Sequence, residues 1–196
     1  MGFTNAELEA FYGVSLPDLA GPGIRMLLVG INPGLHTAAV QAHFSRRGNR
    51  FYPALFRAGI LERVVDASSG FDPADRAHIL ARGIGITSLV RGATRRADEL
   101  SASELRSGAV ELTERVAALR PAVVAMLGIT AYRVAFGRKD AVVGRQPEPI
   151  AGAQLWVVPN PSGLNAHASL AQLADAYREA AIAAGIPVYA PPIPEQ

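Results

Sequence analysis

The sequence predicts an α/β fold, a three-layer αβα sandwich around a mostly parallel sheet of about four strands. Short, uninterrupted apolar runs alternate with longer segments that carry helix caps and helical spacing of apolar residues. Runs that are apolar throughout are typical of strands buried on both faces, as in parallel sheets. The alternation of strand and helix therefore favours a parallel sheet with helices on both sides.

The expected strands are the apolar runs of strand length. Their approximate ranges are 25–31, 84–90, 122–127 and 155–158. The expected helices begin at capping residues and end at glycine or proline. Asn49 is a candidate N-cap, and Ser101 with Glu104 forms a capping box. The helices are expected over 49–58, 73–81, 101–119, 130–136 and 169–184.

Length and composition favour one domain over residues 1–196, with an N-terminal helix or arm over 1–20 and a proline-rich tail over 187–196. No window approaches the roughly 18 consecutive apolar residues of a membrane span. The N-terminus lacks a basic segment followed by an apolar stretch, so we expect a cytoplasmic protein. The chain contains no cysteine, which excludes disulfides, thiolate metal sites, a cysteine nucleophile and iron–sulfur clusters.

Two expected strands end in turns that contain Asn-Pro. Asn32 lies in GINPG, after the first strand, and Asn160 lies in PNPSGLN, after the last. Ligands of parallel sheets bind outside the carboxyl ends of the strands, so the two turns are expected to converge on one crevice. GINPG matches neither the dinucleotide nor the triphosphate motif. The alternative is a pair of tight turns that only join strand to helix.

The basic residues are nearly all arginine, and several lie next to the candidate loops. The net charge is only +2, although the sequence pI is about 9.3. Arginine binds phosphate through two parallel hydrogen bonds, which favours phosphate contact over a surface that is merely rich in arginine. The clusters are Arg46, Arg47 and Arg50; Arg91, Arg95 and Arg96; and Arg138 with Lys139.

Four segments together resemble the uracil–DNA glycosylase superfamily, and specifically its mismatch-specific uracil/thymine branch (Mug type). They are GINPGLHTAAVQAHFSRRGNRFYPAL, GITSLVRGATRRADELSASEL, AMLG with the helix that carries Tyr132, and WVVPNPSGLNAH. The resemblance spans about residues 21–180. It implies an enzyme that flips a base out of duplex DNA and hydrolyses the bond between base and deoxyribose.

The resemblance assigns roles to residues in both turns. Asn32 matches the residue that holds the attacking water, and Asn160 matches the one that stabilises the departing base anion. An amide orients water but does not accept its proton, so Asn32 alone implies slow catalysis. Phe44 matches the aromatic that stacks on the flipped base, with a core phenylalanine as the alternative. Backbone groups near Ile31 and Phe44 are expected to contact the pyrimidine edge.

Gly34 stands where superfamily members strict for uracil carry a tyrosine that blocks substituents on carbon five of the base. The resemblance therefore implies loose specificity, with thymine and damaged pyrimidines sterically allowed. Discrimination would come partly from how easily a mispaired base leaves the stack.

The NPSGL turn matches the segment that enters the duplex. Leu164 corresponds to the apolar wedge that fills the place of the flipped nucleotide. Ser162, Gly163 and Asn165 are expected to contact DNA near the unpaired guanine. The chain carries Ala166 where a basic residue is often found, so His167 is a candidate for that contact, with a solvated loop histidine as the alternative.

Asp98 is the candidate acid for activating water, because GINPG contains no carboxylate. It lies in the loop after the second expected strand, beside Arg95 and Arg96, which we expect to contact DNA. The alternative is a solvated acid or a partner of these arginines.

The predicted function is a monofunctional glycosylase for uracil, and for thymine or damaged pyrimidines opposite guanine, that leaves an abasic site. Its partner would be double-stranded DNA; no metal, cofactor or membrane is expected, and no feature asks for more than a monomer. The only lysine, Lys139, lies outside every motif, so amine-based lyase chemistry is not expected. A non-catalytic mismatch-binding protein and, more weakly, a nucleoside hydrolase remain as alternatives.

Overall fold

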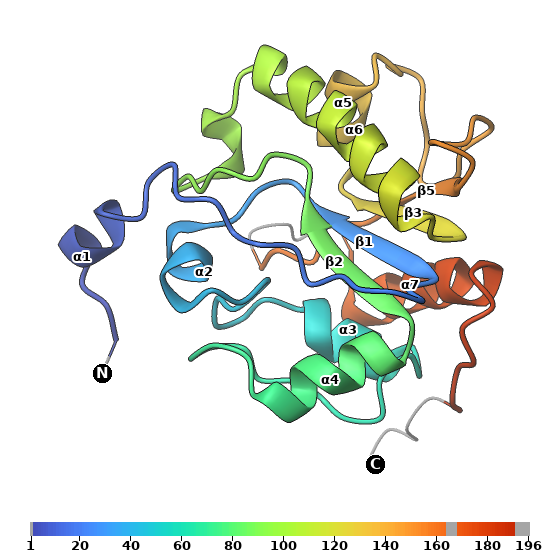
Figure 1. The fold of residues 1–196 in the computed structure, drawn as a ribbon, viewed down its shortest axis with the longest axis horizontal. Helices are drawn as coiled ribbons and strands as arrows, with labels where there is room; N and C mark the ends of the chain where they lie inside the picture. The colour runs from blue at the N-terminus through green and yellow to red at the C-terminus, as the bar shows by residue number, and fades with distance from the viewer. Residues whose placement is uncertain (1, 164–167, 191–196) are drawn as a thin grey trace.

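The fold is built on a five-stranded, mostly parallel sheet. The computed structural model describes residues 2–163 and 168–190. The strand order is β2-β1-β3-β5-β4. Figure 1 labels the first four of these strands, and β4 pairs antiparallel with β5 at the edge of the sheet. The strands are β1 (Met26–Gly30), β2 (Ile84–Ser88), β3 (Val123–Leu127), β4 (Gly144–Arg145) and β5 (Gln154–Val158).

The predicted fold class is confirmed, and the predicted count of about four strands is one too low. The additional strand, β4, has two residues and pairs with β5 at the sheet edge. So short a strand leaves no apolar pattern in the sequence. The first two strands also end earlier than predicted, at Gly30 and Ser88.

The four parallel strands end at the same edge of the sheet. β1 pairs in parallel with β2 and with β3, and β3 pairs in parallel with β5. Every residue of β1, β2 and β3 is buried, which explains the apolar sequences of β1 and β3 and the apolar start of β2. The polar turns after these strands therefore open on one side of the molecule.

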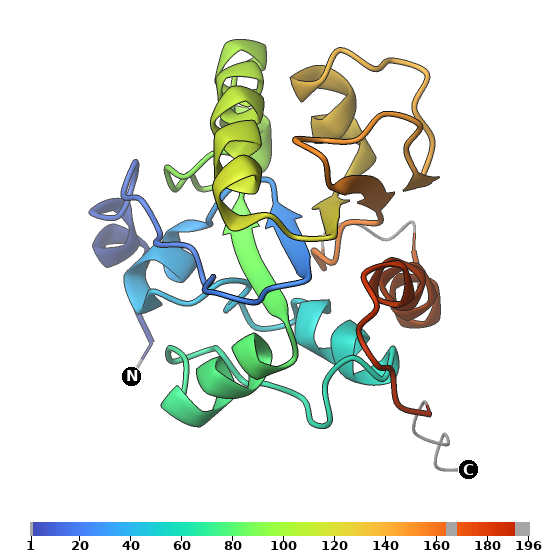
Figure 2. The ribbon, with the colours of Figure 1, turned by 45° about the vertical axis from the view of Figure 1, so that its right-hand side comes forward.

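Helices cover both faces of the sheet (Figure 2). Alternate residues of β1 contribute to the two cores: Met26 and Leu28 to one, Leu27 and Val29 to the other. The first core is closed by α3 (Phe51–Arg57), α4 (Pro73–Ala81) and α7 (Leu170–Ala183), and the second by α5 (Ala102–Leu119) and α6 (Ile129–Ala135).

Local capping signals locate most helix starts. Ser101 forms a capping box with Glu104, and Ser169 forms one with Gln172. Helix α3 begins two residues later than predicted, with Arg50 at the N-cap position. Asn49 still contributes, since its Oδ1 accepts the Phe51 amide hydrogen at 2.9 Å.

Three short helical segments lie in the N-terminal arm and in the loops that follow β1 and β2. They are α1 (Asn5–Glu9), α2 (Leu35–Val40) and the 3₁₀ turn η1 (Ala97–Glu99). Helix α1 packs against α2, where Leu8 and Phe11 contact a small apolar cluster that contains Leu35. Among the described helices none is long and apolar enough to cross a membrane.

Candidate active site at the carboxyl edge of the sheet

A cavity of about 700 Å³ lies where the parallel strands end. Both Asn-Pro turns line it, together with the loops that follow β2 and β3. Its volume falls in the range typical of small-ligand sites, about 300–1,000 Å³. Its lining includes most of the residues proposed from sequence: Ile31, Asn32, Gly34, Phe44, Arg95, Arg96, Asp98, Asn160 and Ser162.

The Asn32 side chain is oriented by the loop after β2. Its Nδ2 donates to Thr94 Oγ1 at 2.7 Å and to the Pro33 carbonyl at 3.2 Å. Thr94 is buried, and its hydroxyl donates in turn to the Arg96 carbonyl at 2.8 Å. With the NH₂ end engaged, Oδ1 is the end of the amide suited to accept a hydrogen bond from water.

Sequence reasoning missed Thr94. The residue lies in the GATRR segment, but no local pattern separates it from other loop threonines. Its backbone N–H donates to the Pro33 carbonyl at 3.1 Å, so two loops far apart in sequence are joined at the Asn32 turn. Thr94 thus positions Asn32 through both its side chain and its backbone.

The Asn160 side chain is held through its oxygen, whereas Asn32 is held through its NH₂ group. Its Oδ1 accepts the backbone N–H of Ser162 at 2.9 Å. Its Nδ2 lies 3.5 Å from the point where a Cβ on Gly128 would be. Ile31 Cδ1 approaches the same point at 3.5 Å, and Gly128 has φ +131°, a conformation that favours glycine. Gly128 is therefore favoured by its backbone conformation, and it lies in contact distance of both turns.

The Phe44 ring lies beside the cavity and is held in place by its neighbours. Its ring stacks on Phe51, with centroids 3.9 Å apart and an interplanar angle of 21°. Its edge lies against the end of β1, because a Cβ on Gly30 would be 3.1 Å from Phe44 Cζ. The half-buried ring packs against the core and also lines the cavity, and its stacking on a flipped base stays a prediction.

His43 lines the same cavity but is held neutral. Its Nε2 lies 3.1 Å from the Pro17 carbonyl, which can only accept, so this nitrogen carries the hydrogen. Burial lowers the pKa of His43 to about 4. A neutral His43 therefore adds no positive charge to the cavity at pH 7.

Ser88 and Thr87 are adjacent in β2, but they have different surroundings. Ser88, at the end of β2, lines the cavity. Thr87 is fully buried and donates to Asp18 Oδ1 at 2.6 Å, so it supports the strand and does not line the cavity.

Asp98 lies at the cavity rim in η1 and pairs with Arg96. Arg96 Nε and Nη2 donate to its two carboxylate oxygens at 3.1 and 2.7 Å. The Asp98 side chain is 63% exposed. Arg95 pairs with Glu9 of α1 at 2.5 Å. These ion pairs correspond to the alternative considered for Asp98, and its role toward water stays a prediction.

The predicted wedge segment is only partly covered. Leu164, Asn165 and His167 lie outside the described residues. Arg50 joins the two flanks of this segment: Nη2 donates to the Ser162 carbonyl at 3.2 Å, and Nη1 donates to the Ala168 carbonyl. The Arg50 backbone N–H also donates to the Pro161 carbonyl at 3.1 Å. Gly163 lies against Gly48, whose carbonyl oxygen would be 3.2 Å from an added Cβ.

In residues 2–163 and 168–190, no group of three or more histidine or acidic side chains is placed to hold a metal ion.

The chain is thus an α/β protein with a polar, aromatic-lined cavity at the strand ends. Residues 17–184 match the model of the uracil DNA glycosylase superfamily, and the chain belongs to that superfamily. Its fold is similar to the solution NMR structure of a candidate uracil DNA glycosylase from Methanosarcina acetivorans. The TM-score is 0.57 at 14% identity, and the match covers 85% of this chain and 97% of the other.

Proposed function

We propose that this protein is a mismatch-specific DNA glycosylase that removes uracil, and more slowly thymine or damaged pyrimidines, from opposite guanine in duplex DNA. The observation that carries the proposal is the opposite orientation of two amides beside one cavity. Asn32 is held by its NH₂ end and Asn160 by its oxygen. One amide is thereby suited to orient water, and the other to donate toward an anion.

The reaction needs three things from this cavity. Phe44 would stack on the everted base, Asn32 Oδ1 would hold water for attack on the anomeric carbon, and Asn160 would stabilise the base as it leaves as an anion. The water supplies the hydroxyl on the anomeric carbon of the abasic product, and the proton of the water goes to a general base or to solvent. Water-based chemistry fits the location of Lys139, which is exposed and does not line the cavity.

The direct test offers labelled duplexes that contain G·U, G·T, A·U or a G·ethenocytosine pair, and single-stranded uracil, followed by alkaline cleavage of abasic sites. Cleavage of G·U that exceeds cleavage of A·U and of single strands is the expected result. Binding to mismatched duplexes without cleavage of any substrate would instead indicate a non-catalytic mismatch-binding protein.

Gly34→Tyr is expected to narrow the substrate range. A Cβ at Gly34 meets no atom within 4 Å, and its φ of −77° suits any residue, so tyrosine enters without backbone strain. The ring would occupy the space of a methyl on carbon five. A hydrophobic steric difference of this size is worth roughly 10–200-fold in rate. Single-turnover rates on G·T and G·U duplexes should show a loss of that order for thymine and little loss for uracil.

Gly34→Ala is the control for this change and should preserve the ratio of the thymine rate to the uracil rate. Equal losses on both bases in Gly34→Tyr would contradict an open space at carbon five.

Asp98→Ala is expected to slow excision by about 10²–10⁴-fold, the range for a lost general base, and to leave DNA affinity unchanged. Rates under saturating enzyme and fluorescence anisotropy with an abasic-site analogue measure the two quantities. Glu99→Ala is the matched control, because Glu99 lies in the same 3₁₀ turn but does not line the cavity. An Asp98→Ala rate equal to wild type would leave Asp98 only as the ion-pair partner of Arg96.

A further inference from the structure

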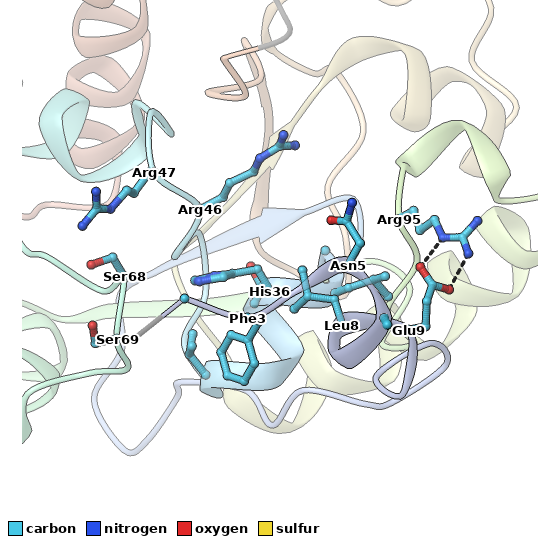
Figure 3. Close-up of a pocket in the computed structure, with 16 residues that line it drawn as sticks. Phe3, Asn5, Leu8, Glu9, His36, Arg46, Arg47, Ser68, Ser69 and Arg95 are labelled. Atoms are coloured by element: carbon cyan, nitrogen blue, oxygen red, sulfur yellow. Dashed lines mark hydrogen bonds and ion pairs between the residues drawn. The ribbon is translucent and has the colours of Figure 1, made fainter.

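A second and larger hollow lies beside the candidate active site. It has a volume of about 1340 Å³ and is bounded by the N-terminal arm with α1, by α2, and by the loops that carry Arg46–Arg47 and Ser68–Ser69. We call it the arm groove. Figure 3 shows Arg47 above Ser68 and Ser69 on one side and Arg95 paired with Glu9 on the other, with His36 and Arg46 between them.

The arm groove is continuous with the active-site cavity. Four residues line both: Gly34, Thr37, Arg46 and Arg95. Ser162 and Ala168, which flank the wedge segment, line only the active-site cavity. A strand that leaves the cavity at Gly34 therefore enters the arm groove directly, away from the wedge.

The polar groups of the arm groove suit a polyanion. Arg46 and Arg47 are exposed, and neither forms an ion pair with any residue that the structure describes. The one carboxylate of the lining, Glu9, is already paired with Arg95. Ser69 adds a hydroxyl donor, whereas the backbone and side chain of Ser68 are hydrogen-bonded to Asp66, a carboxylate outside the lining. These hydrogen bonds, and to a smaller extent Arg47, lower the pKa of Asp66. Guanidinium and hydroxyl groups are those through which proteins contact the phosphates of DNA without reading sequence.

The distribution of these groups favours an extended backbone over a single phosphate. The arginines lie at separate places along the lining, with the apolar side chains of Phe3 and Leu8 on the wall between them (Figure 3). A site for one phosphate would instead need donors that converge on one point.

We infer that the arm groove binds the sugar–phosphate backbone of the damaged strand on one side of the everted nucleotide, with Arg46 and Arg47 on successive phosphates. The inference rests on the proposed function for the identity of the strand. It adds a binding site that includes the N-terminal arm and lies beyond the cavity where the base is held.

The test is the salt dependence of DNA binding by the Arg46→Gln, Arg47→Gln double variant. A contact with one phosphate contributes about 0.9 to the slope of log affinity against log salt. The double variant should therefore lose about 1.8 of the slope, which corresponds to a loss of affinity on the order of tenfold to a hundredfold near 0.1 M salt. The test is read from affinity and not from the excision rate, because Arg46 also lines the active-site cavity.

The matched control is Arg57→Gln, Arg106→Gln. It removes the same charge from exposed positions on α3 and α5 that line neither hollow. Its slope should remain close to wild type. Equal slopes in the Arg46/Arg47 variant and the wild type would overturn the inference, as would equal losses of slope in the two double variants.

Shortening the duplex from each end in turn supplies an independent measurement. Wild-type affinity should fall when the side that fills the arm groove is cut back, and the Arg46/Arg47 variant should be insensitive to cuts on that side only. Sensitivity on both sides in the variant would also overturn the inference. Binding to an abasic-analogue duplex needs no catalysis, so a wild-type protein that binds but excises nothing refutes the proposed function and still tests the groove.

Discussion

Asn32→Ala is expected to reduce the single-turnover rate of uracil excision by about 10³-fold and to leave affinity for a G·U duplex close to wild type. The amide is the group suited to hold the attacking water, and removing a positioned catalytic group costs roughly 10²–10⁴-fold. Affinity should persist because the proposed stacking on Phe44 and the proposed phosphate contacts do not involve Asn32. Rapid-quench kinetics and anisotropy measure the two effects.

Thr94→Val is expected to reduce the excision rate less than Asn32→Ala does. It removes the oxygen that accepts from Asn32 Nδ2 at 2.7 Å while preserving the volume of the side chain. An amide that is present but poorly oriented should give a loss smaller than that of Asn32→Ala. Wild-type rates in Asn32→Ala would refute the assignment of water to this residue.

Asn160→Ala is expected to slow uracil excision by about 10²–10³-fold, the usual cost of losing one hydrogen-bond donor to a developing anion. The loss should depend on the leaving group. A base that is more stable as an anion, such as 5-fluorouracil, needs less help and should lose less rate. Single-turnover rates on matched duplexes with uracil or 5-fluorouracil provide the comparison.

This dependence separates the two asparagines. Asn32→Ala should lower the rates for uracil and 5-fluorouracil by similar factors, because water positioning serves both bases. If Asn160→Ala also lowered both rates equally, the assignment of Asn160 to the departing base would be wrong.

The sheet could be predicted because strands buried on both faces are mostly apolar: β1 and β3 carry no polar side chain, and β2 is apolar up to Thr87 and Ser88. Helix α5 could be located because a capping box is a local signal, read within four residues at Ser101. The capping box of α7 at Ser169 was not recognised, although the helix itself and its end before Gly185 were predicted. Strand β4 could not be predicted, since its two residues are ordered by pairing with β5 and not by a pattern of their own.

The site was predictable only where a motif marks it. The Asn-Pro turns identified Asn32 and Asn160, and the alternation of strands and helices placed both at one sheet edge. Thr94 went unnoticed because its hydrogen bond to Asn32 joins residues 62 positions apart. The partner of Arg95, Glu9, is 86 positions away. The sequence shows the chemical type of each of these residues, but it does not show the long-range contacts that determine what each residue binds.

The bridge formed by Arg50 has a consequence for how this protein can diversify. One guanidinium ties together the carbonyls of Ser162 and Ala168, so the intervening stretch begins and ends at anchors that belong to the scaffold. A change of length or composition between those anchors leaves Asn160 and the floor of the cavity in place. Under the proposed function, the residues expected to read the opposite strand could therefore be replaced, by selection or by an engineer, while those proposed for hydrolysis keep their positions.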